Sequence, residues 1–282
     1  MTRATLAALL LLACAGGARA FEIVAALSSD SGHYREAYEG FQEEWGSSVT
    51  AVVLGRDSLP PAPDVVVAFG SRAALKEWRT SPLIVTCLAP GARPDRASEV
   101  LSVELLATPA SLMERMRKLM PRLKVLRVLW SSDFEESEIQ ELAEASKAQD
   151  IVLLSERVAD PSRLPQALRS LKAPADALWL MPDPALVSSA NFATLREYSA
   201  AARVPFLAPT EGLAEKGATA TLAAPFRDAG RAAAAVLRAR LRGEVVHGPA
   251  HPTRVVVTVN ASAARIVGLD IKAAEGVDRV IP

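Results

Sequence analysis

The sequence has few of the residues on which metal centres and disulfide frameworks depend. Its 282 residues include two cysteines and three histidines. A structural zinc site usually takes four Cys or His ligands, and a disulfide framework takes several cysteine pairs. Both are therefore nearly excluded as the basis of this fold.

An excess of charge of one sign is also lacking. There are 32 Lys and Arg against 32 Asp and Glu, so the formal net charge is zero. Such a chain has no global attraction to nucleic acid or to an anionic membrane. With 50% hydrophobic and 23% charged residues, the composition is typical of a soluble globular protein rather than a disordered one. The length suits one large domain or two lobes of ordinary size.

No apolar run is long enough to cross a membrane. Residues 4–13 (ATLAALLLLA) form the first such run, and a bilayer needs roughly 20 residues. A basic residue at position 3 precedes this run, and a small-x-small motif ending at Ala20 follows it. These features predict a secretory signal peptide over residues 1–20.

The signal region has a second interpretation. The letters LLAC, ending at Cys14, resemble a bacterial lipobox, in which the cysteine is lipidated and becomes the mature N-terminus. Cleavage after Ala20 and lipidation of Cys14 both remain open, and either predicts an exported protein, in the periplasm or lipid-anchored at the cell envelope. The other cysteine, Cys87, lies in an apolar run with no His, Lys or helix start beside it. We expect an inert buried thiol there.

Short apolar, β-branched runs alternate with longer amphipathic ones along the rest of the chain. The predicted strands are residues 22–27, 49–54, 65–69, 83–88, 125–130, 151–155, 177–181, 204–207, 219–223 and 255–259. The predicted helices are residues 34–44, 73–79, 111–120, 135–148, 163–172, 192–201 and 228–242, the last with Asp228 placed to cap its amides. Strands that are apolar throughout are typical of a parallel sheet covered on both faces. The fold class is therefore α/β, built from right-handed βαβ units.

Three irregular segments interrupt this alternation, at residues 89–98, 209–217 and 243–252. Three breaks rather than one indicate two Rossmann-like lobes, each with a parallel sheet, joined by several crossings. We assign residues 21–104 plus about 225–250 to the first lobe, and residues 105–224 plus about 251–282 to the second.

Motifs of nucleotide-dependent and hydrolytic enzymes are missing. There is no G-x-x-x-x-G-K-[ST], no G-x-G-x-x-G after a strand and no G-x-S-x-G. Ser71 follows a strand, where backbone amides could bind an anion, but as a nucleophile it would need a base. His247 and His251 lie in a Gly/Pro-rich loop and are interpreted as solvated surface, whereas His33 follows the first strand and could face a ligand. We expect no enzyme, no cofactor and no metal site.

An ordered set of short motifs resembles a known family. The motifs are EGF at 39–41, PDV at 63–65, GS at 70–71, DAL with PD at 176–183, PF at 205–206, EG at 211–212, GA at 217–218, FRDAG at 226–230, GE at 243–244 and NASAA with GL at 260–269. As an ordered set they resemble the bacterial ABC-transporter solute-binding family of the tryptophan/tyrosine type, which has a type I periplasmic-binding fold. The resemblance spans the chain after residue 20.

The resemblance implies capture of an amino-acid-like small molecule between two hinged lobes and its delivery to an ABC permease and its ATPase. With the balanced charge, we expect no nucleic acid partner, and contact with the membrane only through a lipid anchor or the permease. Ligand contacts are expected at the carboxyl ends of strands. The candidates are Ser28, Ser29 and Ser71 in the first lobe and Trp130, Ser131, Asp183, Thr210 and Glu211 in the second.

Three of these candidates have assigned counterparts in the family. Gly70-Ser71 takes the place of its Gly-Thr/Ser loop, and Trp130-Ser131 that of its Tyr-Asn. Trp130 would form a flat wall for a ring or belong to the core, and Glu211 would pair with a ligand ammonium or remain a surface charge.

The chain departs from the family pattern where further ligand contacts are expected. Residues 89–91 read APG in place of a D-P loop, and residues 103–106 read VELL in place of an N-x-T-G turn. The ligand therefore does not follow from the resemblance. An alternative also stays open, namely an exported sensor or structural partner of the same fold that has lost uptake.

Overall fold

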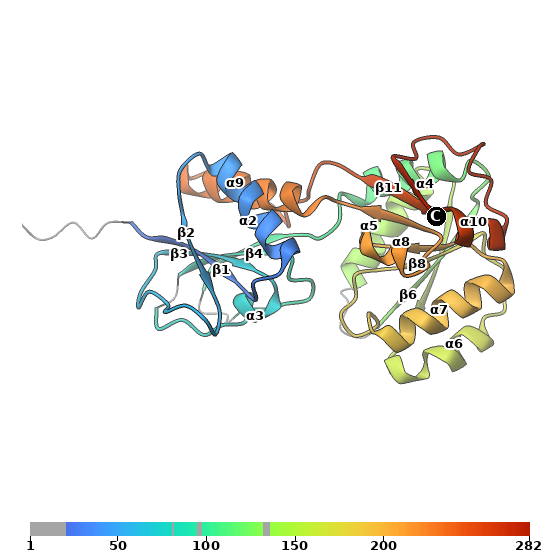
Figure 1. Ribbon diagram of the computed structural model, residues 1–282, viewed down its shortest axis with the longest axis horizontal. Coiled ribbons are helices and arrows are strands. Elements are labelled where there is room, and N and C mark those ends of the chain that lie inside the picture. Colours follow the sequence, from blue (N-terminus) through green and yellow to red (C-terminus); the bar gives the residue numbers. More distant parts are fainter. Residues whose placement is uncertain (1–20, 81, 95–97, 132–135) are drawn as a thin grey trace, which may run out of the picture.

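The computed structural model describes residues 21–80, 82–94, 98–131 and 136–282. The predicted signal peptide, with Cys14, lies outside the described residues. Within them the chain forms two α/β lobes that lie side by side, each around its own sheet (Figure 1). This confirms the predicted fold class. No helix in these ranges has the length and apolar character needed to cross a membrane.

The first lobe is built on a five-stranded parallel sheet with strand order β2-β1-β3-β4-β5. Its strands are β1 (Ile23–Leu27), β2 (Thr50–Val53), β3 (Val65–Phe69), β4 (Leu83–Cys87) and β5 (Val100–Val103). All five residues of β3 are buried, because the sheet is covered on both faces. Helices α2 (Gly32–Trp45) and α9 (Phe226–Leu241) cover one face, and the short helix α3 (Ser71–Ala74) with neighbouring loops covers the other.

Helix α9 comes from a distant part of the chain and lies along α2 (Figure 1). Glycines make this close approach possible. A Cβ atom added at Gly230 would lie 1.7 Å from the carbonyl oxygen of Ala37, and one added at Gly40 would lie 1.9 Å from that of Arg227. Arg227 also forms an ion pair with Glu43 of α2. The core of the first lobe is therefore completed by a helix that follows most of the second lobe in sequence.

The second lobe is built on a seven-stranded sheet with strand order β12-β11-β10-β9-β8-β6-β7. Its strands are β6 (Val125–Trp130), β7 (Val152–Arg157), β8 (Ala177–Leu180), β9 (Phe206–Ala208), β10 (Ala220–Ala223), β11 (Val256–Asn260) and β12 (Arg279–Ile281). Its helices are α4 (Pro109–Leu119), α5 (Glu136–Lys147), η1 (Pro161–Arg163), α6 (Leu164–Ser170), α7 (Ser189–Ala202), α8 (Gly212–Glu215) and α10 (Ala261–Val267). Apolar residues of α4, α5 and α10 pack on one face, and those of α6 and α7 on the other.

One strand pair in this sheet is antiparallel. The strands from β6 to β10 run parallel to one another, but β11 runs antiparallel to β10, with Ala223 opposite Val256. The reason lies in the connection. The chain leaves β10 for the first lobe and re-enters β11 at the same edge, so β11 must run in the opposite direction.

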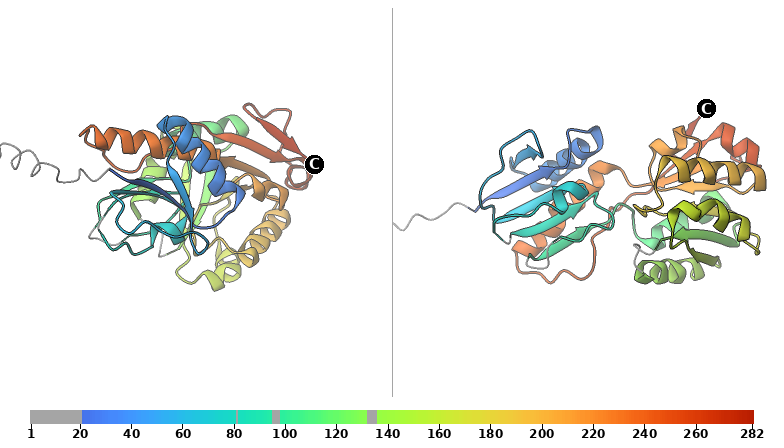
Figure 2. Two further views of the ribbon diagram at one scale, coloured as in Figure 1. Left: turned by 60° about the vertical axis from the view of Figure 1, so that its left-hand side comes forward. Right: turned by 90° about the horizontal axis from the view of Figure 1, so that it is seen from below.

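Three crossings join the lobes, at residues 104–108, 224–225 and 242–255. The first and third run side by side, because the Glu104 amide donates to the Ala250 carbonyl at 2.8 Å and the His251 Nδ1 lies 3.0 Å from the Leu106 carbonyl oxygen. Figure 2 shows the crossings as the connections between the two lobes. The first and third crossings are therefore joined by hydrogen bonds into one hinge element.

An ion pair ties the third crossing to the start of α9. The Arg254 Nε lies 2.5 Å from Asp228 Oδ2, and its Nη2 lies 3.1 Å from Oδ1. The expectation that Asp228 caps this helix is corrected here. The N-cap residue is Pro225, and Asp228 lies in the first turn with its carboxylate on Arg254 and Arg231.

We expect Arg254→Gln to loosen this hinge. The substitution removes a two-point ion pair from the buried carboxylate of Asp228, which should lower the free energy of unfolding by about 1 kcal/mol and the melting temperature by about 2–4 °C. Small-angle X-ray scattering should show a broader distribution of interlobe distances. Arg242→Gln is the matched control on the same crossing, since its ion pair with Glu244 is exposed at both ends. Equal effects of the two substitutions would contradict the hinge assignment.

Candidate functional site

The topology turns the carboxyl ends of β1 to β5 in the first sheet and of β6 to β10 in the second sheet toward each other. The carboxyl end of β5 leads into the first crossing, and that of β10 leads into the second. Strands parallel to these two end at the same edges. The loops that follow the strands therefore face the other lobe, where ligands bind in open α/β sheets.

A pocket of about 460 Å³ lies between the lobes at these edges. This volume is in the range of small-molecule sites. The first lobe contributes Thr86, residues 89–93 and residues 100–104; the second contributes Leu106, Ala107, Pro109, Leu112, Glu138, Glu141, Leu142, Trp179, Met181, Pro182 and Pro184; the third crossing contributes Val246, Gly248, Pro249 and His251. Both lobes and the hinge thus share one pocket.

The pocket wall is mostly apolar and rigid. Five of its residues are prolines, at positions 90, 109, 182, 184 and 249, and each fixes its own backbone φ angle. The lobes come close where Gly91, at a φ of +69°, faces Pro184: a Cβ atom on this glycine would lie 3.5 Å from the proline Cγ. The glycine thus brings the β4–β5 loop close to the opposite lobe.

Acidic groups predominate among the charged side chains of the pocket. Glu104, Glu138 and Glu141 line it, against one guanidinium from Arg93. His251 presents its Nδ1 to the Leu106 carbonyl oxygen, which assigns the proton to Nδ1 and leaves Nε2 as an acceptor in the neutral ring. The charged groups are therefore suited to a ligand that is apolar and carries a cationic group.

Trp179 is a lining residue that the sequence did not indicate as functional. It lies in the middle of β8, its side chain is fully buried, and its indole N–H has no hydrogen-bond partner in the structure. Its place within an apolar strand favoured a core role. His251 was also missed, because its Gly/Pro-rich loop was interpreted as solvated surface, whereas the structure half-buries it in the pocket.

The predicted serines of the first lobe lie close together. Ser28 is buried, and its Oγ accepts a hydrogen bond from the Ala73 amide at 2.9 Å. A Cβ atom on Gly70 would lie 2.6 Å from that oxygen, so the loop carrying Ser71 packs directly on Ser28. Ser29 and Ser71 are half-buried, and within the described ranges their hydroxyls make no hydrogen bond.

In the second lobe, Ser131 and Asp183 also lie together, within one network. Asp183 is fully buried and accepts from the Ser131 amide at 2.6 Å, the Ser131 hydroxyl at 2.9 Å and the Ala185 amide at 3.0 Å. These bonds tie the end of β6 to the end of β8. Trp130, just before Ser131, is half-buried, and the Arg157 guanidinium lies 5.6 Å from its ring centroid.

Glu211 and Thr210 follow β9. The Glu211 carboxylate forms an ion pair with Arg279 of β12, whereas the Thr210 side chain is half-buried. None of the eight predicted ligand contacts is among the described residues that line the 460 Å³ pocket. Their role in binding stays a prediction.

Cys87 and His33, two further residues of the first lobe, have pKa values shifted by burial. Cys87 is buried, as expected, and burial raises the pKa of its thiol far above the ordinary value, so the thiolate is not formed near neutral pH. His33 is exposed at the start of α2, with its ring centroid 4.1 Å from that of Tyr34 and 5.6 Å from that of Phe226. Partial desolvation lowers the pKa of His33, which favours the neutral ring near pH 7.

The chain is similar to a known protein family in sequence and to solved structures in fold. The family model described as ABC transporter substrate binding protein matches residues 105–277. No curated protein matches the chain significantly.

Solved structures of similar fold cover nearly the whole chain. An ABC domain from Streptococcus pneumonia in complex with L-Trp has a TM-score of 0.62 at 16% identity, covering 92% of this chain and 99% of that one. A ligand-free, open substrate-binding protein with adhesive properties from Clostridium difficile has a TM-score of 0.62 at 16% identity, covering 92% and 98%. A conserved domain protein from Vibrio cholerae has a TM-score of 0.60 at 14% identity, covering 92% and 99%.

Proposed function

Because the chain belongs to the ABC transporter substrate-binding protein family and has the type I periplasmic-binding fold, we propose that it captures an amino-acid-like molecule between its lobes and delivers it to an ABC import permease. The observation that carries this proposal is the pocket of about 460 Å³ lined by both lobes and by the hinge. The family match covers residues 105–277, which include the whole second-lobe contribution to that pocket. Export rests on the signal sequence at residues 1–20 or on lipidation of Cys14.

The mechanism follows from the position of the pocket. A ligand that touches both lobes binds the closed arrangement more tightly than the open one, so it shifts the population toward closure. The hydrogen-bonded crossings at Glu104, Leu106, Ala250 and His251 would act as the pivot. The permease would then distinguish loaded from empty protein by the arrangement of the lobes.

The pocket favours a ligand with an apolar body and an ammonium group. Trp179, Met181 and the prolines supply the apolar surface. Glu211, the acidic group first expected to pair with the ammonium, forms an ion pair with Arg279, so we assign this role to the exposed carboxylate of Glu141 at the pocket rim. The half-buried hydroxyls of Ser29, Ser71 and Thr210 remain candidates for hydrogen bonds to a ligand carboxylate.

Thermal unfolding against a panel of amino acids and related amines tests the proposal. A ligand at a hundred times its Kd should stabilise the protein by about 2.7 kcal/mol, which is a shift of about 5–10 °C for a chain of this size. Glu141→Gln should weaken binding about fivefold, since a rim ion pair contributes about 1 kcal/mol. Ser71→Ala should reduce the shift if the first-lobe serines contact the ligand.

Glu144→Gln is the matched control for Glu141→Gln. Glu144 lies on the same helix, is exposed and is not among the residues that line the pocket. A ligand shift that is equal in the unsubstituted protein and in both glutamate variants would mean that Glu141 makes no contact with the ligand. A shift that also survives Ser71→Ala would mean that the ligand makes no contact with this first-lobe serine.

A second function is favoured by the composition of the pocket. Residues 89–91 and 103–106, where the sequence departs from the family motifs, lie at this pocket. A protein that had exchanged uptake for sensing or adhesion would change these positions first, and the similar Clostridium difficile protein is described as having adhesive properties. A panel of ligands that gives no shift would favour this alternative over transport.

A further inference from the structure

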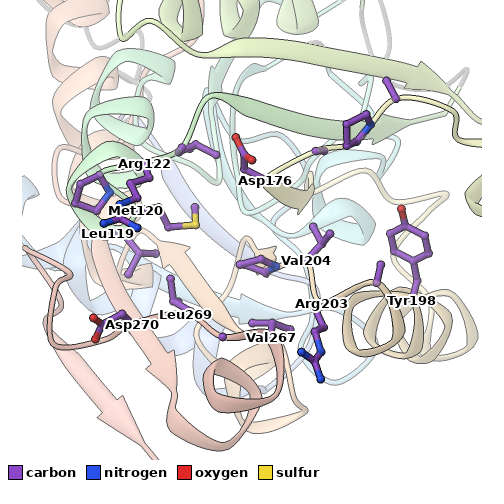
Figure 3. A pocket seen from close by; sticks show the side chains of 18 of the residues that line it. Leu119, Met120, Arg122, Asp176, Tyr198, Arg203, Val204, Val267, Leu269 and Asp270 are labelled. Carbon is purple, nitrogen blue, oxygen red and sulfur yellow. The ribbon is translucent and has the colours of Figure 1, made fainter.

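A second hollow lies away from the cleft, on the second lobe. Its volume is about 810 Å³, and it is bounded by residues 119–123 before β6, 171–176 before β8 and 202–205 before β9 (Figure 3). These three strands are parallel, so their amino ends share one edge of the sheet. Because the crossings leave from the carboxyl edge, this hollow is separate from the pocket between the lobes.

The floor of the hollow is apolar. Met120, Leu123 and Val267 are buried beneath it, and Val204 and Leu269 are half-buried at its surface. Figure 3 shows Met120, Val204, Val267 and Leu269 grouped around the hollow, with the Tyr198 ring at one side. The volume falls in the range of small-molecule sites, so the hollow can cover the apolar body of such a ligand.

The rim carries three cations without partners. Arg122, Lys172 and Arg203 are exposed, and none has a hydrogen bond or ion pair to its side chain in the described part of the protein. Both carboxylates at the hollow already accept hydrogen bonds from backbone amides: Asp176 Oδ2 accepts from residues 124 and 125 at 2.8 Å, and Asp270 Oδ1 accepts from residue 272 at 3.0 Å. The rim thus carries three cationic groups against two carboxylates, and this positive net charge favours an anion.

Arg203 is held at the rim by an unusual backbone conformation. It terminates α7 in the left-handed region, with φ at +54°, a position where helices usually place glycine. A long cationic side chain at this position lowers stability relative to glycine, yet it lies at the edge of the hollow (Figure 3). Strained residues of this kind cluster at ligand sites.

From the apolar floor, the unpaired cations and Arg203, we propose that this hollow is a second binding site, specific for a small organic anion with an apolar body. The site is independent of the cleft. It would let a metabolite with a carboxylate, sulfonate or phosphate group bind the second lobe whether or not the cleft is occupied.

The test uses the anionic dye 8-anilinonaphthalene-1-sulfonate as probe, with its fluorescence titrated against the purified protein. We expect saturable binding that weakens with added salt. Arg203→Gly should raise the Kd about tenfold, the equivalent of about 1.4 kcal/mol, while leaving the melting temperature equal or higher because glycine relieves the positive φ. If Arg203 only stabilised the fold, its substitution could not weaken dye binding while leaving the melting temperature equal or higher. The double variant Arg122→Gln with Lys172→Gln should weaken binding in the same direction.

Two controls separate this site from the cleft. Arg163→Gln removes an exposed cation of the same lobe that is not among the residues lining the hollow, and should leave the Kd unchanged. Glu141→Gln, at the cleft, should also leave dye binding unchanged, and Arg203→Gly should leave any amino-acid shift unchanged. Absence of saturable dye binding, or a Kd in both Arg203→Gly and the double variant that equals that of the unsubstituted protein, would overturn the proposal.

Discussion

Replacement of Gly230 by alanine is expected to destabilise the first lobe by about 3 kcal/mol, the upper end of the usual range for an overpacked core. The added Cβ would lie 1.7 Å from the Ala37 carbonyl oxygen and 2.8 Å from the Phe41 amide nitrogen, both in the backbone of α2. No rotamer change can relieve a clash between a Cβ and a backbone. Helices α2 and α9 must therefore move apart and open the core that Phe41 and Leu237 fill.

Calorimetry of the purified protein checks this expectation, together with a matched substitution in the same helix pair. Gly32→Ala places a Cβ at the start of α2 where no atom lies within 4 Å, so it should change the melting temperature by no more than about 2 °C. Gly230→Ala should lower it by about 6–12 °C. Similar melting temperatures for the two variants would show that the helices are not packed as closely as the structure has them.

Asp183→Ala is expected to have a comparable effect on the second lobe. The carboxylate is fully buried and accepts from the Ser131 amide, the Ser131 hydroxyl and the Ala185 amide. Its removal leaves buried donors without an acceptor and unties the ends of β6 and β8. We expect a loss of about 3 kcal/mol, which is about 6–12 °C in melting temperature.

The comparison for Asp183 is Asp160→Ala, because both aspartates precede a proline and accept from nearby amides. Asp160 is exposed and accepts from Ser162 at 3.0 Å, so its loss should amount to about 1 kcal/mol. The experiment also decides the role of Asp183. A fall in melting temperature of under about 2 °C, together with loss of the ligand shift, would assign Asp183 to the ligand instead of to the lobe.

The fold could be predicted from the sequence where apolar runs were long and uninterrupted. All five residues of β3 are buried, and a strand buried on both faces is apolar along its whole length. An amphipathic helix such as α5 packs on one face only, so its apolar residues recur with the helical period. β5 and β12 were missed, because they have four and three residues and contain exposed or half-exposed positions. The helix predicted at 73–79 ends at Ala74, so most of that segment is loop that covers the sheet.

For the candidate site, the sequence could predict the edge of each sheet at which ligands bind, but not the side chains that line the pocket. From the sequence, the carboxyl ends of the parallel strands were expected to share one edge, and in the structure these edges face the other lobe. It could not indicate which of these side chains would already be engaged within their own lobe. Asp183 and Glu211 have the residue types of ligand contacts, but one is held by Ser131 and the other pairs with Arg279, 68 positions away. The pocket instead takes His251 from a crossing, and only the folded hinge brings that residue beside Leu106.

The position of α9 in the chain also has a consequence for biogenesis. Glu43 and Arg227 form an ion pair across 184 positions, so the first lobe cannot close its core until α9 (Phe226–Leu241) has been synthesised. Until then one apolar face of the β2-β1-β3-β4-β5 sheet has no helix from α9 to cover it. Contacts of such long sequence separation slow folding and leave apolar surface exposed to aggregation. If the chain is exported unfolded, chaperones would therefore have to protect the strands of the first lobe longest, although these strands are synthesised before those of the second lobe.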